Sequence, residues 1–518
     1  MRKNIAILLF VLAPILVFGQ YQNVQIGNYT SANEPSIWIN PKNPLEIMAG
    51  SNNNFWYYSE DGGYTWDAAV LSSPEYGVWG DPVIMTDTAG DFYYFHLSNP
   101  VIGNWIDRIV CQKYDKESGQ WSPGSYMGLN GDKAQDKHWA VIDPQTNIIY
   151  VTWTQFDDYG VSDPSCQSNI RFSKSADGGE SWTEAISINE VHGNCIDSDE
   201  TTEGAVPAVG PNGEIYVSWS GPEGIVFDRS FDSGDSWLDE DIPVDPHIGG
   251  WDINIPGISR SNGMPVTKCD LSDSPYRGTI YINFADQRNG VDDTDIWLTK
   301  STDQGDSWSE PVRINDDGPG NQQFFTWMTI DQTNGYLYFV YYDRRAYDDN
   351  RTDVYMAWSG DGGETFTNVK ISESPFVPWD NIFFGDYNNI AAHDNMVRPI
   401  WTRMDDGQRS IHTALVDMTV GITETPLIPV SMEQNYPNPF KQTTLINYKI
   451  HQAGKVSLTV YDQTGRTVAM PINQVYHERG KHEYQFIARN WNLNPGVYFY
   501  EISSDKQAVH HKMIIATD

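Results

Sequence analysis

The sequence predicts an all-β protein in which a large β-propeller is followed by a small β-sandwich. One eight-residue pattern, Ser-x-Asp-x-Gly-x-(Ser/Thr)-(Trp/Phe), recurs at intervals of several tens of residues, which is typical of propellers and solenoids. Between its copies, β-branched and aromatic residues alternate and end at turns rich in Asp, Asn, Gly or Pro, as in antiparallel hairpins. After Asp417 a different set of short strands begins.

The repeated pattern predicts a folded hairpin loop. Its Asp and Ser side chains can bond nearby backbone N–H groups, its Gly can take a positive φ, and its aromatic residue can pack under the turn. This pattern resembles the Asp-box, and the chain is similar to the sialidase-like β-propeller superfamily. The resemblance implies that each box joins the third and fourth strands of a blade, away from the binding face. The five copies begin at Ser59, Ser175, Ser230, Ser301 and Ser359.

The number of hairpin units favours seven blades. The units start near residues 35, 81, 138, 205, 252, 327 and 386, and the second one contains a decayed box at 114–121. The last unit ends near Val416 without a fourth strand, and residues 22–27 could supply that strand and close the ring. Sialidases have six blades, so six is the alternative.

The two ends of the chain predict export. Basic residues followed by an apolar run from Ile5 to Phe18 indicate a secretory signal peptide over 1–19, and no later segment could span a membrane as a helix. The propeller is expected over 20–420, a linker over 421–430 and a small Ig-like β-sandwich over 431–518. Cys166 and Cys195 are the favoured disulfide among three possible pairings, because both flank one predicted blade.

The last domain resembles the type A C-terminal sorting domain of type IX secretion cargo. The resemblance rests on Tyr436-Pro-Asn-Pro-Phe440, on Gly496-Val-Tyr498 and on the order of the short strands. It implies passage through the inner membrane by the signal peptide and across the outer membrane by this domain. The type IX secretion machinery is then a partner, and the protein is expected to be secreted or held at the cell surface.

The charge of the chain limits its other partners. There are 33 Lys and Arg residues against 69 Asp and Glu residues, a formal net charge of −36. So acidic a chain argues against nucleic-acid binding and against adhesion to anionic lipid. Its many aromatic residues suit stacking on sugar rings, and an extracellular glycan or glycoprotein is the expected partner.

Propeller geometry places the candidate site on the face opposite the boxes, in the loops that enter strand one or leave strand two. These loops predict a funnel ringed by carboxylates and arginines, although each of these residues could instead have a structural role. Arginines there could grip a carboxylate or sulfate, and paired carboxyls could act as acid and base. The candidate catalytic residues are Asp81, Asp136, Glu203 and Tyr387, and the candidate ligand-binding residues are Arg288, Arg344, Arg345, Arg403, Asp252 and Asp386, with Glu34, His138, Asp157 and Asp158 nearby.

The sialidase resemblance is incomplete at this face. It implies three arginines on a substrate carboxylate, a Tyr–Glu nucleophile pair and an Asp acid, for which Tyr387, Glu203 and Asp81 are the available residues. The first arginine should lie in an Arg-Ile-Pro motif on the first strand. That strand instead begins Glu34-Pro-Ser-Ile, and no arginine occurs from Gln20 to Asp107.

Two functions remain open from sequence. The first is a glycoside hydrolase or polysaccharide lyase acting on acidic sugars, and the second is a non-catalytic glycan- or protein-binding propeller. No cofactor is expected. Acidic stretches at Asp292–Asp295 and Asp348–Asp353 could bind calcium through oxygen ligands, but neither has the spacing of a dedicated calcium loop.

Overall fold

The computed structural model describes residues 21–418 and 430–517, apart from 433, 451–452 and 505–506. The predicted signal peptide and nearly all of the predicted linker lie outside the described residues. The chain divides after Met418 into two compact units. The described residues are almost entirely β-strand, with one short 3-10 helix, η1 (Ala488–Trp491). None of their helices is long and apolar enough to cross a membrane.

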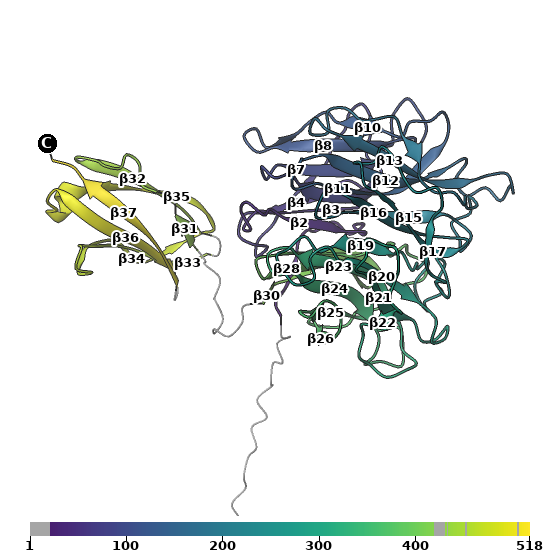
Figure 1. Cartoon of the computed structure of the whole chain (residues 1–518). Helices are drawn as coiled ribbons and strands as arrows, with labels where there is room; N and C mark the ends of the chain where they lie inside the picture. The colour runs from purple at the N-terminus through teal and green to yellow at the C-terminus, as the bar shows by residue number, and fades with distance from the viewer. Residues whose placement is uncertain (1–20, 419–429, 433, 451–452, 505–506, 518) are drawn as a thin grey trace, which may run out of the picture. The chain divides into compact units, whose positions relative to one another are not determined.

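The first unit is a propeller of seven antiparallel sheets, the blades (Figure 1). Blade 1 contains β2 (Ser36–Ile39), β3 (Ile47–Ser51), β4 (Phe55–Ser59) and β5 (Asp67–Val70). Blade 2 contains β6 (Gly80–Thr86), β7 (Phe92–Leu97), β8 (Ile109–Asp115), β9 (Gln120–Trp121) and β10 (Ser125–Met127). Blade 3 contains β11 (Ala134–Ile142), β12 (Ile149–Phe156), β13 (Ser168–Ser175) and β14 (Ile186–Ser187).

The next blades repeat this order. Blade 4 contains β15 (Glu203–Val209), β16 (Ile215–Gly221), β17 (Gly224–Ser230) and β18 (Ile242–Asp245). Blade 5 contains β19 (Val266–Cys269), β20 (Ile280–Asp286), β21 (Asp295–Ser301) and β22 (Val312–Arg313). Blade 6 contains β23 (Gln323–Asp331), β24 (Tyr336–Asp343), β25 (Asp353–Ser359) and β26 (Thr367–Lys370). Blade 7 contains β27 (Asn389–His393), β28 (Met396–Asp405), β29 (Gln408–Ala414), β30 (Val416–Asp417) and β1 (Asn23–Gln25).

The ring closes as the sequence predicts. First strands of neighbouring blades contact one another in the order β2, β6, β11, β15, β19, β23, β27 and back to β2. The N-terminal strand β1 pairs with β29, with Val24 opposite Thr413. Buried Arg398 of blade 7 adds a second link, because its guanidinium donates to the carbonyl of Gly62 in blade 1 at 2.7 Å. Seven blades are therefore confirmed. One blade start was wrong: the first strand of blade 5 begins at Val266 and follows a long irregular segment instead of beginning near 252.

The box turns have the geometry expected from their residues. In the fourth copy, the Ser301 hydroxyl donates to Asp303 Oδ1 at 2.7 Å and accepts from the N–H of Gly305 at 2.8 Å. The N–H and hydroxyl of Ser307 then donate to the two oxygens of Asp303 at 3.0 and 2.6 Å. These bonds satisfy the polar groups of the turn, so the boxes support the fold and offer no free chemical group.

Aromatic and aliphatic side chains fill the space between blades. The largest fully buried side chains include three tryptophans on second strands, Trp153, Trp219 and Trp401. Burial of such side chains on adjoining sheets is the main stabilising contribution to the ring. It gives a rigid frame to the loops on the face opposite the boxes, which we call the upper face.

The second unit is a β-sandwich of two sheets. One sheet has the order β31 (Val430–Met432), β32 (Thr443–Ile450), β35 (Gly480–Ile487). The other has the order β34 (Thr467–His477), β33 (Gly454–Tyr461), β36 (Gly496–Ser504), β37 (Gln507–Ile515). Its own core includes Phe440, Val460 and Tyr500, all buried.

Replacing Gly305 by Ala should destabilise the propeller. Gly305 has a φ of +94°, and an added Cβ would lie 2.2 Å from Cε1 of Phe227. We expect Gly305→Ala to lower the free energy of unfolding by about 2–4 kcal/mol, measured by chemical denaturation. Gly318→Ala is the matched control, since an added Cβ there meets no atom within 4 Å. Equal stability of the two variants would contradict the described packing of the box.

Candidate functional site

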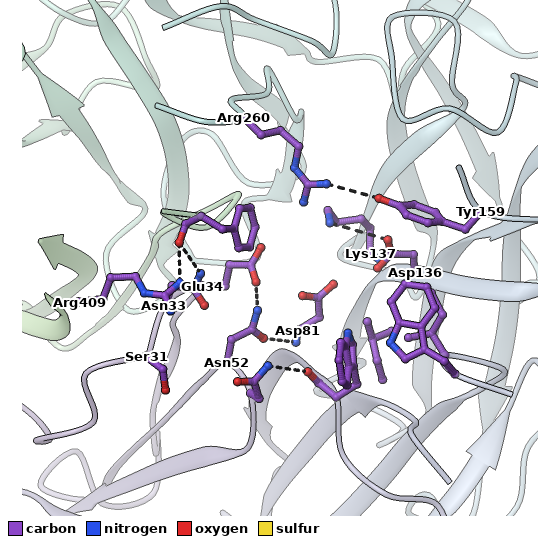
Figure 2. A pocket seen from close by; sticks show the side chains of 16 residues that line it. Ser31, Asn33, Glu34, Asn52, Asp81, Asp136, Lys137, Tyr159, Arg260 and Arg409 are labelled. Carbon is purple, nitrogen blue, oxygen red and sulfur yellow. Dashed lines mark hydrogen bonds and ion pairs between the residues drawn. The ribbon is translucent and has the colours of Figure 1, made fainter. Parts of the chain in front are cut away.

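A cavity of about 280 Å³ opens at the propeller axis on the face opposite the boxes. Its lining comes from loops that enter first strands or leave second strands, together with the loop that precedes blade 5. We call this cavity the axial pocket (Figure 2). It is lined by Ser31, Asn33, Glu34, Asn52, Asn53, Trp79, Asp81, Leu97, Trp105, Ile106, Asp136, Lys137, Tyr159, Arg260, Phe383 and Arg409.

Unusual backbone conformations direct charged side chains into the axial pocket. Glu34 precedes β2, Asp81 is the second residue of β6 and Lys137 is the fourth residue of β11. Each has a positive φ, of 50°, 52° and 47° respectively. The strand register also shifts between Gly80 and Val83 and between Asp136 and Trp139. Bulges of this kind re-aim side chains, and strained non-glycine positions concentrate at functional sites.

Asp386 is the centre of the charged network beneath the axial pocket. Its side chain is buried, and its carboxylate accepts from Lys137 Nζ at 2.8 Å and from Arg260 Nε at 2.9 Å. Its backbone carbonyl accepts from Asn262 at 2.9 Å. Burial alone would raise the pKa of Asp386, but the two cations outweigh it and lower that pKa. One carboxylate thus joins loops of blades 3, 5 and 7.

A disulfide fixes the next part of the network. Cys166 and Cys195 are bonded, as predicted, and they join the loop that carries Tyr159 to the loop that carries Asp197. Arg260 Nη1 donates to Asp197 Oδ2 at 2.7 Å, and the Tyr159 hydroxyl donates to the same oxygen at 3.0 Å. Arg260 is therefore held by two carboxylates, Asp386 and Asp197.

Asn52 links the first two blades at the axial pocket. Its amide nitrogen donates to the carboxylate of Glu34, and its amide oxygen accepts from the N–H of Asp81 at 2.6 Å. The other oxygen of Glu34 accepts from the N–H of Asp386 at 3.0 Å. Both oxygens of Glu34 are therefore occupied within the protein.

Asp81 and Asp136 form a pair of neighbouring carboxyls in the axial pocket. Burial raises the pKa of Asp81 to about 7, the charge of Lys137 opposes the shift, and the neighbouring carboxyl of Asp136 adds to it. Oδ2 of Asp81 is buried and has no donor among the described residues. Asp81 thus retains a proton close to neutral pH.

Aromatic side chains form the rim of the axial pocket. Trp79 and Trp105 are 40% and 44% exposed, although side chains of this size usually seek burial. Their rings meet edge to face at 5.6 Å, and Trp105 meets Tyr159 in the same way at 6.0 Å. Exposed rings beside a polar cavity are suited to stacking on a ligand.

The structure separates the four candidate catalytic residues into two groups. Asp81 and Asp136 line the axial pocket, whereas Glu203 and Tyr387 are buried and do not. The Tyr387 hydroxyl and both oxygens of Glu203 have no hydrogen-bond partner among the described residues, so these two do not bond each other. Burial raises the pKa of both groups well above its usual value. The nucleophile pair implied by the sialidase resemblance is absent from this geometry.

The predicted convergence of arginines is wrong. None of the four arginines lines the axial pocket, and each is held within its own blade or by a nearby loop. Arg288 pairs with Asp286 at 2.6 Å, Arg345 pairs with Asp343 at 2.8 Å, and Arg403 pairs with Asp405 at 2.6 Å. Arg344 is buried and donates to the carbonyl of Pro256 at 2.6 Å. The exposed Asp252 also lies outside the lining.

Sequence reasoning missed the cations that do reach the axial pocket, Lys137, Arg260 and Arg409. Lys137 lies between Asp136 and His138, which are both candidate site residues from the sequence. Arg260 lies in the loop that enters β19, the first strand of blade 5. Loop position was therefore an available signal for both. The Asp-x-Arg spacing at 286–288 and 343–345 was the corresponding signal that those arginines are paired locally.

The acidic stretches do not form a metal centre in the described residues. No group of three or more His, Cys, Asp or Glu side chains there is arranged to hold a metal ion. Asp295 accepts from Asn289 at 2.6 Å and pairs with Arg313, and Asp349 pairs with Arg351.

Comparisons with known proteins define the C-terminal unit. Residues 434–516 match the family described as the secretion system C-terminal sorting domain. The protein is therefore cargo of type IX secretion that is secreted or displayed at the cell surface, as predicted. No curated protein matches the chain.

Several solved structures resemble the chain at low identity. An ulvan lyase of a polysaccharide lyase family is 12% identical with a TM-score of 0.46, and 76% of this chain and 96% of that chain are covered. The NanB sialidase from Streptococcus pneumoniae is 9% identical with a TM-score of 0.41, over 72% and 83%. A Hadza microbial sialidase is 14% identical with a TM-score of 0.39, over 72% and 73%. Likeness at this level carries no functional argument, so the site must be interpreted from its own chemistry.

The titration of Asp81 should appear in the pH dependence of stability. Its folded pKa of about 7 lies above the unfolded value of about 4, so the folded state binds more protons between these values. Wild-type stability should therefore fall as pH rises through this window. We expect Asp81→Asn to be more stable than wild type above pH 7, by on the order of a few kcal/mol, with the difference vanishing near pH 4.

Denaturant unfolding at a series of pH values measures this effect. Asp273→Asn is the control, because Asp273 is an exposed carboxyl on the turn between β19 and β20. A difference between wild type and Asp81→Asn that does not change with pH would contradict the described environment of Asp81.

Proposed function

We propose that the propeller binds an extracellular glycan in its axial pocket. The observation that carries the proposal is an exposed aromatic wall, Trp79 and Trp105, beside the carboxyls of Asp81 and Asp136 in one cavity. Aromatic faces give sugar rings a large apolar contact, and a few placed polar groups fix their orientation. Export by type IX secretion brings the propeller to the side of the membrane where such glycans are found.

The charges of the axial pocket do not support an acidic sugar as the ligand. Lys137 and Arg260 are already paired with Asp386 and Asp197, and the four arginines predicted to grip a carboxylate lie elsewhere. Arg409 is the remaining lining cation, and it donates to the carbonyl of Phe383 at 2.5 Å beside Glu34.

Glycoside hydrolysis is the second candidate, and it is favoured by the raised pKa of Asp81. A carboxyl that keeps its proton near neutral pH can serve as a general acid. However, hydrolysis needs two suitably spaced catalytic groups, with carboxyls about 5–5.5 Å apart in retaining enzymes and about 6.5–9.5 Å apart in inverting ones, and Glu203 and Tyr387, the expected partners of Asp81, do not line the pocket. Binding without turnover is therefore the better supported function.

A glycan array with the purified propeller, followed by titration of the best ligand, tests the proposal. We expect Trp105→Ala to weaken binding by about tenfold or more, because an exposed aromatic anchor is lost. Trp379→Ala is the matched control, since Trp379 is equally exposed at 45% but lies outside the lining. Absence of any glycan ligand, or equal losses in both variants, would overturn the proposal.

A screen for release of reducing ends from the same glycans decides between the two candidates. Turnover by the wild type that is abolished in Asp81→Asn would establish hydrolysis. Binding without turnover is the expected result.

A further inference from the structure

The axial pocket presents negative charge to a ligand. Two of its lining cations are held from behind, Lys137 by Asp386 at 2.8 Å and Arg260 by Asp197 at 2.7 Å. The lining carboxyls Asp81 and Asp136 have no comparable partner, since the nearest cation, Lys137, stands 3.9 Å from Oδ2 of Asp136. A ligand that enters therefore meets Asp136 and a partly protonated Asp81, and neither carboxyl has a close cationic partner of its own.

One atom of this pair indicates what is missing. Asp81 is only 6% exposed, it lines the cavity, and its Oδ2 has no hydrogen-bond donor among the described residues. An unsatisfied buried carboxylate oxygen is costly, and it is relieved either by a proton or by a donor that carries positive charge. Because Asp136 is adjacent, a cationic donor would relieve the repulsion within the pair at the same time.

The aromatic wall favours the same kind of donor. The exposed rings of Trp79 and Trp105 line the cavity that holds Asp81, and Tyr159 continues this wall. Aromatic faces attract ammonium groups, and the attraction is larger in partly desolvated sites. The cation that suits an aromatic wall beside a carboxyl pair is an organic ammonium group.

We propose that the axial pocket recognises a glycan with free, non-acetylated amino groups, and that Asp81 and Asp136 receive one ammonium group. This inference rests on the proposed function and adds the chemical class of the ligand. The sugar ring lies against the aromatic wall, and the ammonium group donates to the carboxyl of Asp81. An acetylated amine carries no charge and only one N–H, so it cannot balance the charge of the pair.

Arg409 offers the main alternative. It lies beside Asn33 and Glu34, on the other side of the pocket from Lys137 (Figure 2). A carboxylate on an acidic sugar could approach it there, although Arg409 already donates to the carbonyl of Phe383. The carboxyl pair therefore favours a cationic ligand, whereas Arg409 favours an anionic one. Measuring the affinity for sugars of each charge distinguishes the two possibilities.

The test is to measure the affinity of the propeller for four β-1,4-linked sugar hexamers by titration. Hexamers of glucosamine, N-acetylglucosamine and glucose differ only at C2, which bears an amine, an acetamide or a hydroxyl, and a hexamer of β-1,4-linked mannuronate supplies the acidic arm. We expect the glucosamine hexamer to bind at least about tenfold more tightly than the other three, as a charge-assisted contact provides. Asp81→Asn should remove this preference while the variant stays folded by thermal melting, and Asp273→Asn should keep it.

The outcomes separate the inference from the proposed function. Equal binding of the amine, acetamide and hydroxyl hexamers, or tightest binding of the acidic one, would overturn the inference and leave glycan binding standing. A short peptide with a lysine side chain tests the other source of an ammonium group. If the peptide binds and no hexamer does, both the inference and the proposed function fail.

Discussion

The salt-bridge network around Asp386 is the interaction on which the upper face depends. One buried carboxylate holds Lys137 from blade 3 and Arg260 from the loop before blade 5, and Asp386 itself precedes the first strand of blade 7. Removing one partner of such a buried network leaves uncompensated charge, which typically costs about 3–5 kcal/mol. The network therefore fixes the loops that form the pocket and also neutralises two cations that would otherwise attract anionic ligands.

This arrangement explains why a propeller with Asp-boxes need not act as a sialidase. The boxes stabilise turns at the opposite end of the blades and contribute nothing to the pocket. At the pocket, Lys137 and Arg260 are paired within the protein, and the carboxyls Asp81 and Asp136 line the cavity. A shared fold therefore does not fix the function of the pocket, which depends on the side chains that its loops supply.

Local patterns in the sequence were sufficient for the architecture and insufficient for the site. Box residues bond one another within eight positions, and each hairpin is contiguous, so the blades could be predicted. The closing strand pairs with a distant segment, and it could be predicted because the last hairpin unit lacks a fourth strand. Arg260 and Asp386 are separated by 126 positions, and no pattern of spacing indicates that they meet. Burial also reversed some expectations, because Glu203 and Tyr387 lie where the sequence places them but their side chains are buried and do not line the cavity.

The most direct measurement is a crystal structure of the propeller with a bound glucosamine oligomer. The central claim is that the pocket at the axis is the ligand site and that its carboxyl pair selects the ligand. The account predicts a sugar ring against Trp105 and an amine nitrogen within hydrogen-bonding distance of Asp81. An oligomer bound at another face, or one in the pocket whose amine points away from Asp81 and Asp136, would contradict it.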